Sequence, residues 1–441
     1  MRTFTFKGLF LTAVFMLLGC LSIQAADDDL ITRQITIKLD KAGTLLDKIG
    51  SSKMYKITNL KIVGKINGTD WKMIRVMAGR DYWGDVTKGN LSVLDLSEAK
   101  IVNGGDEYFV RGDYTSNDQI GDYAFYNCSG LTSLNLPAGI TSIGWGAFEG
   151  CSGLTSLNLP DGITSIGVNA FKGCSGLTSL TLPAGITIIC EGAFINCSGL
   201  TSLNLPAGIT SIGGNTFEGC SGLTSLTLPS SLTTIGFGAF DGCSGLTSLT
   251  LPAGITEIDN ATFYDCSGLT SLTLPAGITS IGSSAFYGCS GLTSLTLPAG
   301  ITSIDFSAFS GCSGLTSLTL PAGITSIDFG AIYGFSGLTS IYVYAEKVPK
   351  MGSDVFYYVD KKNCTLYVPQ GTETDYFLAD VWGDFENIVE FDATGIDKTT
   401  TSTDVEEVSR FSADGQRLAV PVKGLNIVKY SDGTVRKVVV K

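Results

Sequence analysis

The chain has 441 residues, of which 44% are hydrophobic and only 16% are charged, and 41 acidic against 29 basic residues give it a formal charge of −12. This acidic balance disfavours nucleic acid and anionic membranes as partners, because both would repel it. The sequence contains no histidine. Its absence removes the commonest general base, the Ser-His and Cys-His nucleophile pairs and every histidine-containing zinc site, which lowers the odds of an enzyme without excluding one.

Residues 1–25 have the pattern of an export signal. Arg2 and Lys7 supply the positive start, and the apolar run at 9–18 is too short to span a bilayer. The position at which this signal ends has two interpretations. Cleavage after Ala25 follows the small-residue rule and is favoured, whereas the tetrapeptide LLGC at 17–20 resembles a bacterial lipobox in which Cys20 would carry a lipid. In both cases we expect an exported protein.

Residues 26–115 are more charged and less regular than the sequence that follows. Alternating apolar residues predict a strand at 35–39, and strands resembling those of the repeats are expected at 57–63 and 91–96. Short helices are expected at 41–49 and 71–77. Because the end of a stacked structure has to be covered, we interpret this region as an N-terminal cap with atypical repeats.

A 23-residue unit recurs through residues 116–345, and its first complete copy is CSGLTSLNLPAGITSIGWGAFEG. A fixed period of this size indicates a solenoid, in which each coil buries its apolar side only by stacking on its neighbours. Cysteine and phenylalanine keep the same beat: Cys128, Cys151, Cys174, Cys197, Cys220, Cys243, Cys266, Cys289 and Cys312, and Phe125, Phe148, Phe171, Phe194, Phe217, Phe240, Phe263, Phe286 and Phe309. The block from 128 to 335 holds ten acidic residues and one basic residue, Lys172.

Within a repeat, leucines alternate with small polar residues, which predicts a strand with one buried side. A proline then ends the strand, and a second extended piece and a short helical or irregular return follow. Each large apolar side chain contributes about 1.5–3 kcal/mol when buried, while ordering the backbone costs about 1–2 kcal/mol per residue, so only the stack is stable. The predicted fold is a right-handed α/β repeat solenoid with a parallel β-sheet.

The chain after the repeats falls into three parts. Residues 346–391 form a C-terminal cap, with strands at 365–369 and 388–391 and an amphipathic helix at 374–382. Residues 392–404 are polar and threonine-rich and form a linker. Residues 405–441 contain a hairpin pattern, and such a small module suits a signal or docking role better than an independent activity.

The repeat motif C-S-G-L-T-S-L-x-L-P-x-G-I-T-S-I-G-x-x-A-F-x-G resembles the BspA-like leucine-rich repeat, also called the Treponema pallidum type, over residues 116–345. The flanking stretches at 68–77 and 94–102, and at 363–369 followed by Trp382, are similar to those of many Bacteroidales members. Residues 405–441 resemble the C-terminal sorting domain of type IX (Por) secretion, in the pair Asp414-Gly415, the stretch 424–428 and the basic end 436–441. The resemblance implies a bacterial surface or secreted protein, of which several relatives are adhesins toward host matrix proteins or other bacteria. It names no ligand.

The regular cysteines are expected to be buried free thiols. Equivalent positions in adjacent coils lie about 4.8 Å apart, within the Cα range of a disulfide, but nine positions in one column cannot all pair. A straight column also does not converge on a point, as a zinc or cluster site requires, so we expect no metal and no cofactor. Asp305 and Asp328 should be stacked neighbours, and two solvated carboxylates are favoured over a shared calcium ion.

Aromatic side chains at the return are candidates either for exposed contacts or for packing between coils, and packing is the commoner use. They are Trp145, Phe237, Tyr264, Phe306 and Phe329.

The outward row of the main strands is the candidate binding surface. It is a flat array of hydroxyl and amide groups suited to many weak contacts with an extended partner; the alternative is simply a soluble face. Its members are Ser133, Asn135, Ser156, Asn158, Ser179, Thr181, Ser202, Asn204, Ser225, Thr227, Ser248, Thr250, Ser271, Thr273, Ser294, Thr296, Ser317 and Thr319.

These patterns favour a secreted or cell-surface adhesin that recognises a host-matrix or bacterial-surface macromolecule, protein or glycan, by repeated shallow contacts. A structural envelope scaffold without a ligand is the alternative, and no motif supports an enzyme. Contact with a membrane is expected only through a lipid on Cys20 or through envelope anchoring, and contact with secretion machinery through the C-terminal module.

Overall fold

The structure is a computed structural model that describes residues 30–393, 407–412, 417–418, 420, 423–430 and 435–440. The export signal at 1–25, Cys20 and nearly all of the linker lie outside the described residues. The chain divides into two compact units, Met1–Phe391 and Asp392–Lys441. Within the described residues, no helix is both long and apolar enough to cross a membrane.

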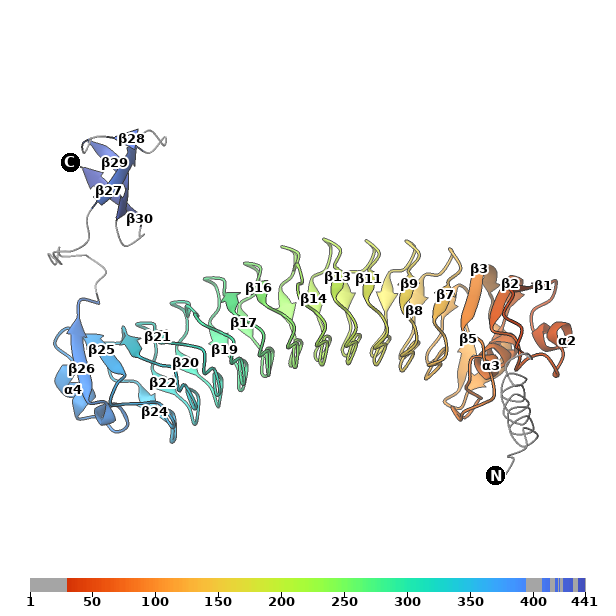
Figure 1. Cartoon of the computed structure of the whole chain (residues 1–441), viewed down its shortest axis with the longest axis horizontal. Coiled ribbons are helices and arrows are strands. Elements are labelled where there is room, and N and C mark those ends of the chain that lie inside the picture. The colour runs from red at the N-terminus through yellow and green to blue at the C-terminus, as the bar shows by residue number, and fades with distance from the viewer. Residues whose placement is uncertain are drawn as a thin grey trace, which may run out of the picture. The chain divides into compact units, whose positions relative to one another are not determined.

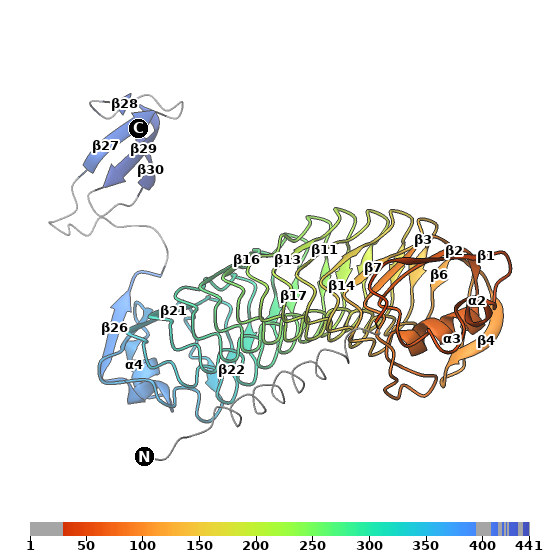
Figure 2. The same ribbon diagram turned by 45° about the vertical axis from the view of Figure 1, so that its right-hand side comes forward.

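The first unit is a stack of coils that lie side by side in chain order (Figures 1 and 2). Main strands that pair do so in parallel with the equivalent strand one repeat later, as Ser133 does with Ser156 and Ser179 with Ser202. One 23-residue repeat is therefore one coil. The main strands are β7 (Ser133–Asn135), β9 (Ser156–Asn158), β11 (Ser179–Thr181), β13 (Ser202–Asn204), β16 (Ser248–Thr250), β18 (Ser271–Thr273), β21 (Ser317–Leu320) and β23 (Ser340–Val343).

The second extended piece of each coil forms a narrower set of parallel strands. Ser142 of one coil pairs with Ser165 of the next, and Ile212 with Ile235. These strands are β6 (Gln119–Ile120), β8 (Ser142–Ile143), β10 (Ser165–Ile166), β12 (Ile188–Ile189), β14 (Ser211–Ile212), β15 (Thr234–Ile235), β17 (Glu257–Ile258), β19 (Ser280–Ile281), β20 (Ser303–Ile304), β22 (Ser326–Ile327) and β24 (Lys350–Met351).

The main parallel sheet is interrupted rather than continuous. Most of its strands have only three residues, so each neighbouring pair shares few hydrogen bonds and a small lengthening breaks the ladder. The backbone bond from Thr201 to the carbonyl of Thr178 is 2.9 Å long within the pair β11–β13, whereas the corresponding bond of Thr224 is 3.5 Å and the coil that contains it forms no main strand.

The returns contain turns and no helix, so the helices of the described residues are confined to the caps. The structure therefore contains less helix than an α/β solenoid is expected to have. The physical reason is that every second return amide bonds to the next coil, as the amide of Phe171 does to the carbonyl of Ala193 at 2.9 Å. The amides between them make only turn bonds to the residue three before, as Lys172 does to Asn169 at 3.1 Å. Asn169 and Gly192, at φ of 57° and 63°, also break any helical run.

The core consists of columns of identical side chains. The three leucines, two isoleucines, alanine, phenylalanine and cysteine predicted to face inward are buried in the copy that begins at Cys174. Consecutive phenylalanine rings from Phe125 to Phe309 stack with centroids 5.1–5.7 Å apart. Beyond Phe309, Ile332 occupies the next position of this buried column.

Every regular cysteine after Cys128 also joins two coils. From Cys151 to Cys312, every thiol donates to the carbonyl of the phenylalanine 26 residues before it, with Sγ–O distances of 3.0–3.2 Å. The cysteines described are free and, apart from half-buried Cys190, all are buried. The prediction of buried free thiols is confirmed, and the structure adds that they are hydrogen-bond donors as well as small apolar groups.

The N-terminal cap replaces the donors of a missing coil. In the interior of the stack, the carbonyls of Trp145 and Ala147 accept amide protons from the preceding coil. The equivalent carbonyls of the first coil belong to Asp122 and Ala124, and they accept from the hydroxyl of Tyr108 at 2.7 Å and the indole of Trp71 at 3.0 Å. Side chains of the cap therefore satisfy the open edge of the stack, as buried polar groups require.

The cap is built from β1 (Ile35–Leu39), α2 (Leu45–Ile49), β2 (Asn59–Ile66), α3 (Gly68–Met77), β3 (Val93–Ile101), β4 (Gly104–Phe109) and β5 (Asp113–Thr115). Helix α3 begins with a capping box between Asn67 and Asp70. Asp70 also accepts from the amides of Gly43 and Leu45, which attaches the segment of α2 to the start of α3.

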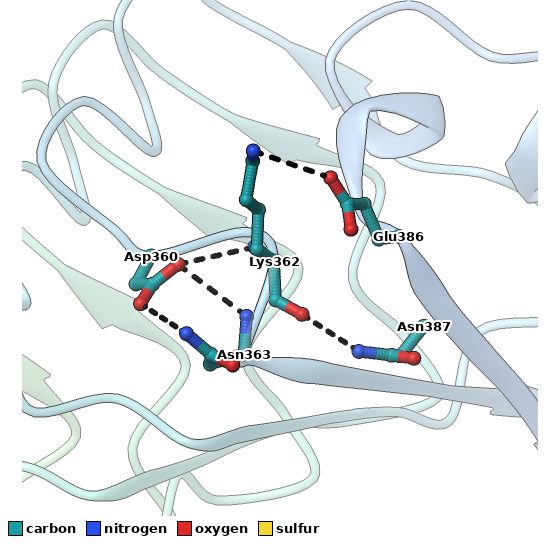
Figure 3. Close-up of polar contacts among 5 residues, drawn as sticks. All are labelled: Asp360, Lys362, Asn363, Glu386 and Asn387. Carbon is teal, nitrogen blue, oxygen red and sulfur yellow. Dashed lines mark hydrogen bonds and ion pairs between the residues drawn. The ribbon is translucent and has the colours of Figure 1, made fainter.

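The C-terminal cap contains β25 (Thr365–Pro369), α4 (Glu373–Phe377), the short 3₁₀ helix η1 (Trp382–Asp384) and β26 (Asn387–Phe391). The helix predicted at 374–382 is shorter, since α4 ends at Phe377. Beyond it, Val381 takes a φ of 72°, which rules out a continuous helix up to the buried Trp382. Figure 3 shows how the segment before β25 contacts the start of β26: the side-chain amide of Asn387 donates to the carbonyl of Lys362 at 2.8 Å. Within the first segment, Asp360 accepts from the side-chain amide of Asn363.

The second unit is an antiparallel sheet of β27 (Glu407–Ser412), β28 (Arg417–Leu418), β29 (Gly424–Tyr430) and β30 (Val435–Val440), in the order β28-β27-β29-β30. The predicted hairpin is confirmed by the pairing of β29 with β30. Its turn, and the turn at Asp414-Gly415, lie outside the described residues.

Candidate binding face on the main strands

The eighteen candidate residues, which we call the strand face, lie on one side of the stack. The alternation within each strand turns them outward while the leucine between them is buried, as Leu180 is between Ser179 and Thr181. Ser133 and Thr319, at the two ends, are half-buried, and the other sixteen are exposed.

The side chains of the strand face do not use their hydrogen-bonding groups inside the protein. Among the described residues, the only bond made by any of them joins Ser317 to Ser340 at 3.0 Å. The threonines just before the strands behave differently, because the hydroxyl of Thr201 donates to the carbonyl of Thr178 and that of Thr270 to Thr247. Polar groups near the strands thus divide into those that join coils and those that are open to an external partner.

Hollows occur along the strand face where a strand meets the turn that follows it. One of 440 Å³ is lined by Asn135, Asn158 and Asp161. A second, of 500 Å³, lies over the coils of Thr181, Asn204 and Ser225 and a third, of 510 Å³, over those of Thr273 and Thr296. Leucine, alanine and proline side chains complete their linings. The strand face therefore carries a row of shallow hollows, which we call the groove, lined about equally by polar and apolar groups.

The model of the BspA-type leucine-rich repeat region, in six copies, matches residues 118–247 and 233–363. The chain belongs to this family. Together the two matched segments include all coils of the strand face.

Solved structures similar to this BspA-type chain come from several bacteria. A leucine-rich repeat protein from Bacteroides ovatus is 26% identical with a TM-score of 0.43, covering 68% of this chain and 84% of its own. A leucine-rich cell surface protein from Faecalibacterium prausnitzii is 28% identical with a TM-score of 0.41, covering 61% and 79%. The leucine-rich repeat protein of T. pallidum is 32% identical with a TM-score of 0.30, covering 39% and 69%. No curated protein matches the chain significantly.

The strand face of this BspA-type stack continues beyond the predicted residues at both ends. Toward the N-terminus, the register leads from Asn135 to Asp95, which is 3.3 Å from Lys61. Toward the C-terminus it leads from Thr319 to Tyr342 and then Tyr367. Sequence reasoning missed these residues. Counting one more repeat from Thr319 would have found Tyr342, whereas the irregular spacing to Asp95 and Tyr367 hides them.

Several of the candidate aromatic residues in the returns of the BspA-type coils are exposed. Trp145 is 55% exposed, Phe237 50% and Phe306 48%. Phe306 and Phe329 do stack between coils, with centroids 5.5 Å apart, and Tyr264 stacks on Tyr287 rather than on another residue of the predicted set. Packing between coils therefore explains some of these residues, but not isolated Trp145 and Phe237.

The buried thiols of the repeats have low reactivity. Burial raises the pKa of Cys174 and of Cys220 to about 12 and that of Cys128 to about 11, so the thiolate that acts as a nucleophile or metal ligand is disfavoured. Within the described part of the chain, no three histidine, cysteine, aspartate or glutamate residues gather where they could hold a metal ion.

The acidic residues of the repeats are bound locally or repel one another. Asp328 accepts from the amide of Phe329 at 2.7 Å, and Asp305 accepts from Ser303 at 3.5 Å. Burial, with smaller repulsion from nearby carboxylates, raises the pKa of Asp241 to about 6.

Proposed function

We propose that the chain is an exported surface adhesin whose strand face binds an extended extracellular macromolecule through many shallow contacts. The observation that carries this proposal is the row of hydroxyl and amide groups that are exposed and make almost no bonds inside the protein. The row repeats nearly unchanged over nine coils, so it offers the same groups at a regular spacing to an extended partner. Many weak contacts in register with an extended ligand then add up to useful avidity.

A binding screen tests the proposal. Purified mature chain would be offered to immobilised matrix proteins, polysaccharides and whole bacterial cells, and binding would be measured over a range of concentrations. Saturable binding to at least one of them is expected. Absence of binding across the whole panel would contradict an adhesin and favour an envelope scaffold, and turnover of any offered glycan or peptide would contradict the non-enzymatic interpretation.

The antiparallel unit formed by β27–β30 is proposed to direct secretion and then to be removed. Its small size and the hairpin of β29 and β30 support a signalling part rather than a catalytic one. Mass spectrometry of the mature protein is the test, and retention of residues 405–441 would contradict a removable sorting signal. The same spectrum distinguishes cleavage after Ala25 from a lipid on Cys20.

A further inference from the structure

Four aromatic side chains close the strand face at its C-terminal end. The rings of Tyr342 in β23 and Tyr367 in β25 are stacked, with centroids 4.3 Å apart and planes 4° from parallel. Phe391, at the end of β26, approaches Tyr342 at 5.8 Å and Tyr344 at 5.0 Å, in both cases with the ring planes nearly perpendicular. All four side chains are half-buried. We call Tyr342, Tyr344, Tyr367 and Phe391 the aromatic wall.

One face of the Tyr342 ring is turned toward the groove. The two tyrosines belong to neighbouring paired strands, so their rings stack in the direction in which the coils follow one another. Tyr367 covers the C-terminal side of Tyr342, and the opposite side is directed toward the coil of Thr319. Threonine is much smaller than tyrosine, so the ring stands as a step at the end of the row. Thr319 is half-buried while Thr296 is exposed, as expected at the foot of this step.

The outward row of the strands that leads to the wall carries no charge. Both outward positions of every coil from Ser133 to Thr319 hold serine, threonine or asparagine, and none is charged. The hollow of 510 Å³ includes Thr296, which is one coil before Thr319. Since successive strands are about 4.8 Å apart, this hollow and the wall lie within reach of one short oligosaccharide.

A sugar polymer has the two chemical surfaces that this arrangement matches. Its hydroxyl rim can exchange hydrogen bonds with the open serine, threonine and asparagine groups, and the C–H face of a sugar ring can pack on an aromatic face. A charged polymer would find no opposite charge along the row. A protein partner would normally be held by large apolar or arginine anchors in pockets, and the row offers none of matching size.

We infer that the strand face binds a neutral linear glycan, with one sugar ring packed against the open face of Tyr342. This inference rests on the proposed function and narrows its ligand to one chemical class. The binding of a protein through the same face is the competing outcome of the test.

The test is calorimetric titration of the full chain with laminarin, mixed-linkage β-glucan, galactomannan, xylan and amylose, with heparin and polygalacturonate as charged comparators. The wall variant is Tyr342→Thr with Tyr367→Thr. It introduces the residue type that the preceding coils carry at the equivalent positions, Thr296 and Thr319. The matched control is Tyr333→Thr with Tyr357→Thr, which removes another stacked tyrosine pair, with centroids 5.5 Å apart, from the returns.

At least one neutral polysaccharide is expected to bind the unchanged chain and the control with the same affinity. The wall variant should bind it about tenfold or more weakly, since loss of one aromatic stacking contact has an effect of this order. Thr319→Glu places a hydrated charge beside the open ring face and leaves the aromatic packing intact, so it should weaken binding even if the wall variant unfolds. The inference is overturned if no neutral polysaccharide binds, if only the charged ones bind, or if Thr319→Glu binds like the unchanged chain. Binding of proteins alone would overturn it and leave the proposed function standing.

Discussion

At the scale of single residues, the cysteine of each repeat carries two structural roles and no reactive one. Its side chain fills a small apolar position, and its thiol bonds to a carbonyl of an adjacent coil at 3.0–3.2 Å. The first role follows from the sequence, because a single column of nine cysteines does not suit disulfides. The second depends on how coils are offset in space, which residue spacing alone does not reveal.

Thiol labelling checks this account. Treating the native chain with a small alkylating reagent should modify Cys190, which is half-buried, and leave the buried cysteines untouched, because burial removes both access and thiolate. Peptide mass spectrometry measures the modified fraction at each site. Denatured chain, labelled at every cysteine, is the control, and rapid labelling of Cys243 in the native chain would contradict a closed core.

The carboxyl group of Asp241 should make the stack less stable as the pH rises. Its folded pKa is about 6 against an ordinary value of 3.8, so the folded state binds the proton more tightly and stability falls as the pH rises through this window. Asp241→Asn should therefore raise the melting temperature at pH 7.5 and leave it nearly unchanged at pH 3.5. Equal effects at the two pH values would show that the substitution acts through packing instead.

At the scale of elements, the caps illustrate which parts of the fold the sequence predicts and which it does not. The strand at Ile35–Leu39 and the helix ending at Met77 follow from local patterns. Local patterns do not show that Trp71 and Tyr108 supply the donors of a missing coil, because the carbonyls that they bond to lie further along the chain. The returns take the irregular form of the two predicted for a related reason: bonds between coils outweigh the local preference for a helix.

Removing one donor of the cap should loosen the first coil. Tyr108→Phe leaves the carbonyl of Asp122 without its bond and should lower stability by about 1–3 kcal/mol, with faster amide exchange at residues 120–128. Tyr82→Phe, which removes a more exposed bond to Glu107, is the control and should change little. Unchanged exchange in Tyr108→Phe would mean that other groups satisfy the edge.

At the scale of the whole molecule, the stack should tolerate the loss of a coil but not the loss of register. Deleting 220–242 removes one full 23-residue repeat, the separation seen in the strand pairing, and joins Gly219 to Cys243. We expect a folded chain with lower stability and a smaller denaturant dependence, since a solenoid's stability is a sum over coils. Deleting 220–241 leaves one extra residue and should disrupt packing at the junction. Circular dichroism during urea unfolding distinguishes the two, and equal curves would show that the register at the junction does not affect stability.

The uniform strand face could be predicted from the sequence, because its residues repeat with the coil. The hollows and the aromatic wall could not, since they depend on how side chains of different coils meet. The face itself also has two interpretations in the sequence, a ligand surface or a merely soluble one. The bonding pattern adds a reason to favour the first, because neighbouring threonines bond between coils while the strand face stays open.

The most direct test of the strand face as the binding surface is a pair of matched charge variants. Ser202→Lys with Ser225→Lys places two lysines in the hollow of 500 Å³, and Trp145→Lys with Phe237→Lys places two lysines at exposed returns. Affinity for the strongest ligand of the binding screen would be measured for both. We predict a loss of about tenfold or more for the first variant and little change for the second. The reverse order, or equal losses, would contradict the assignment of binding to the strand face.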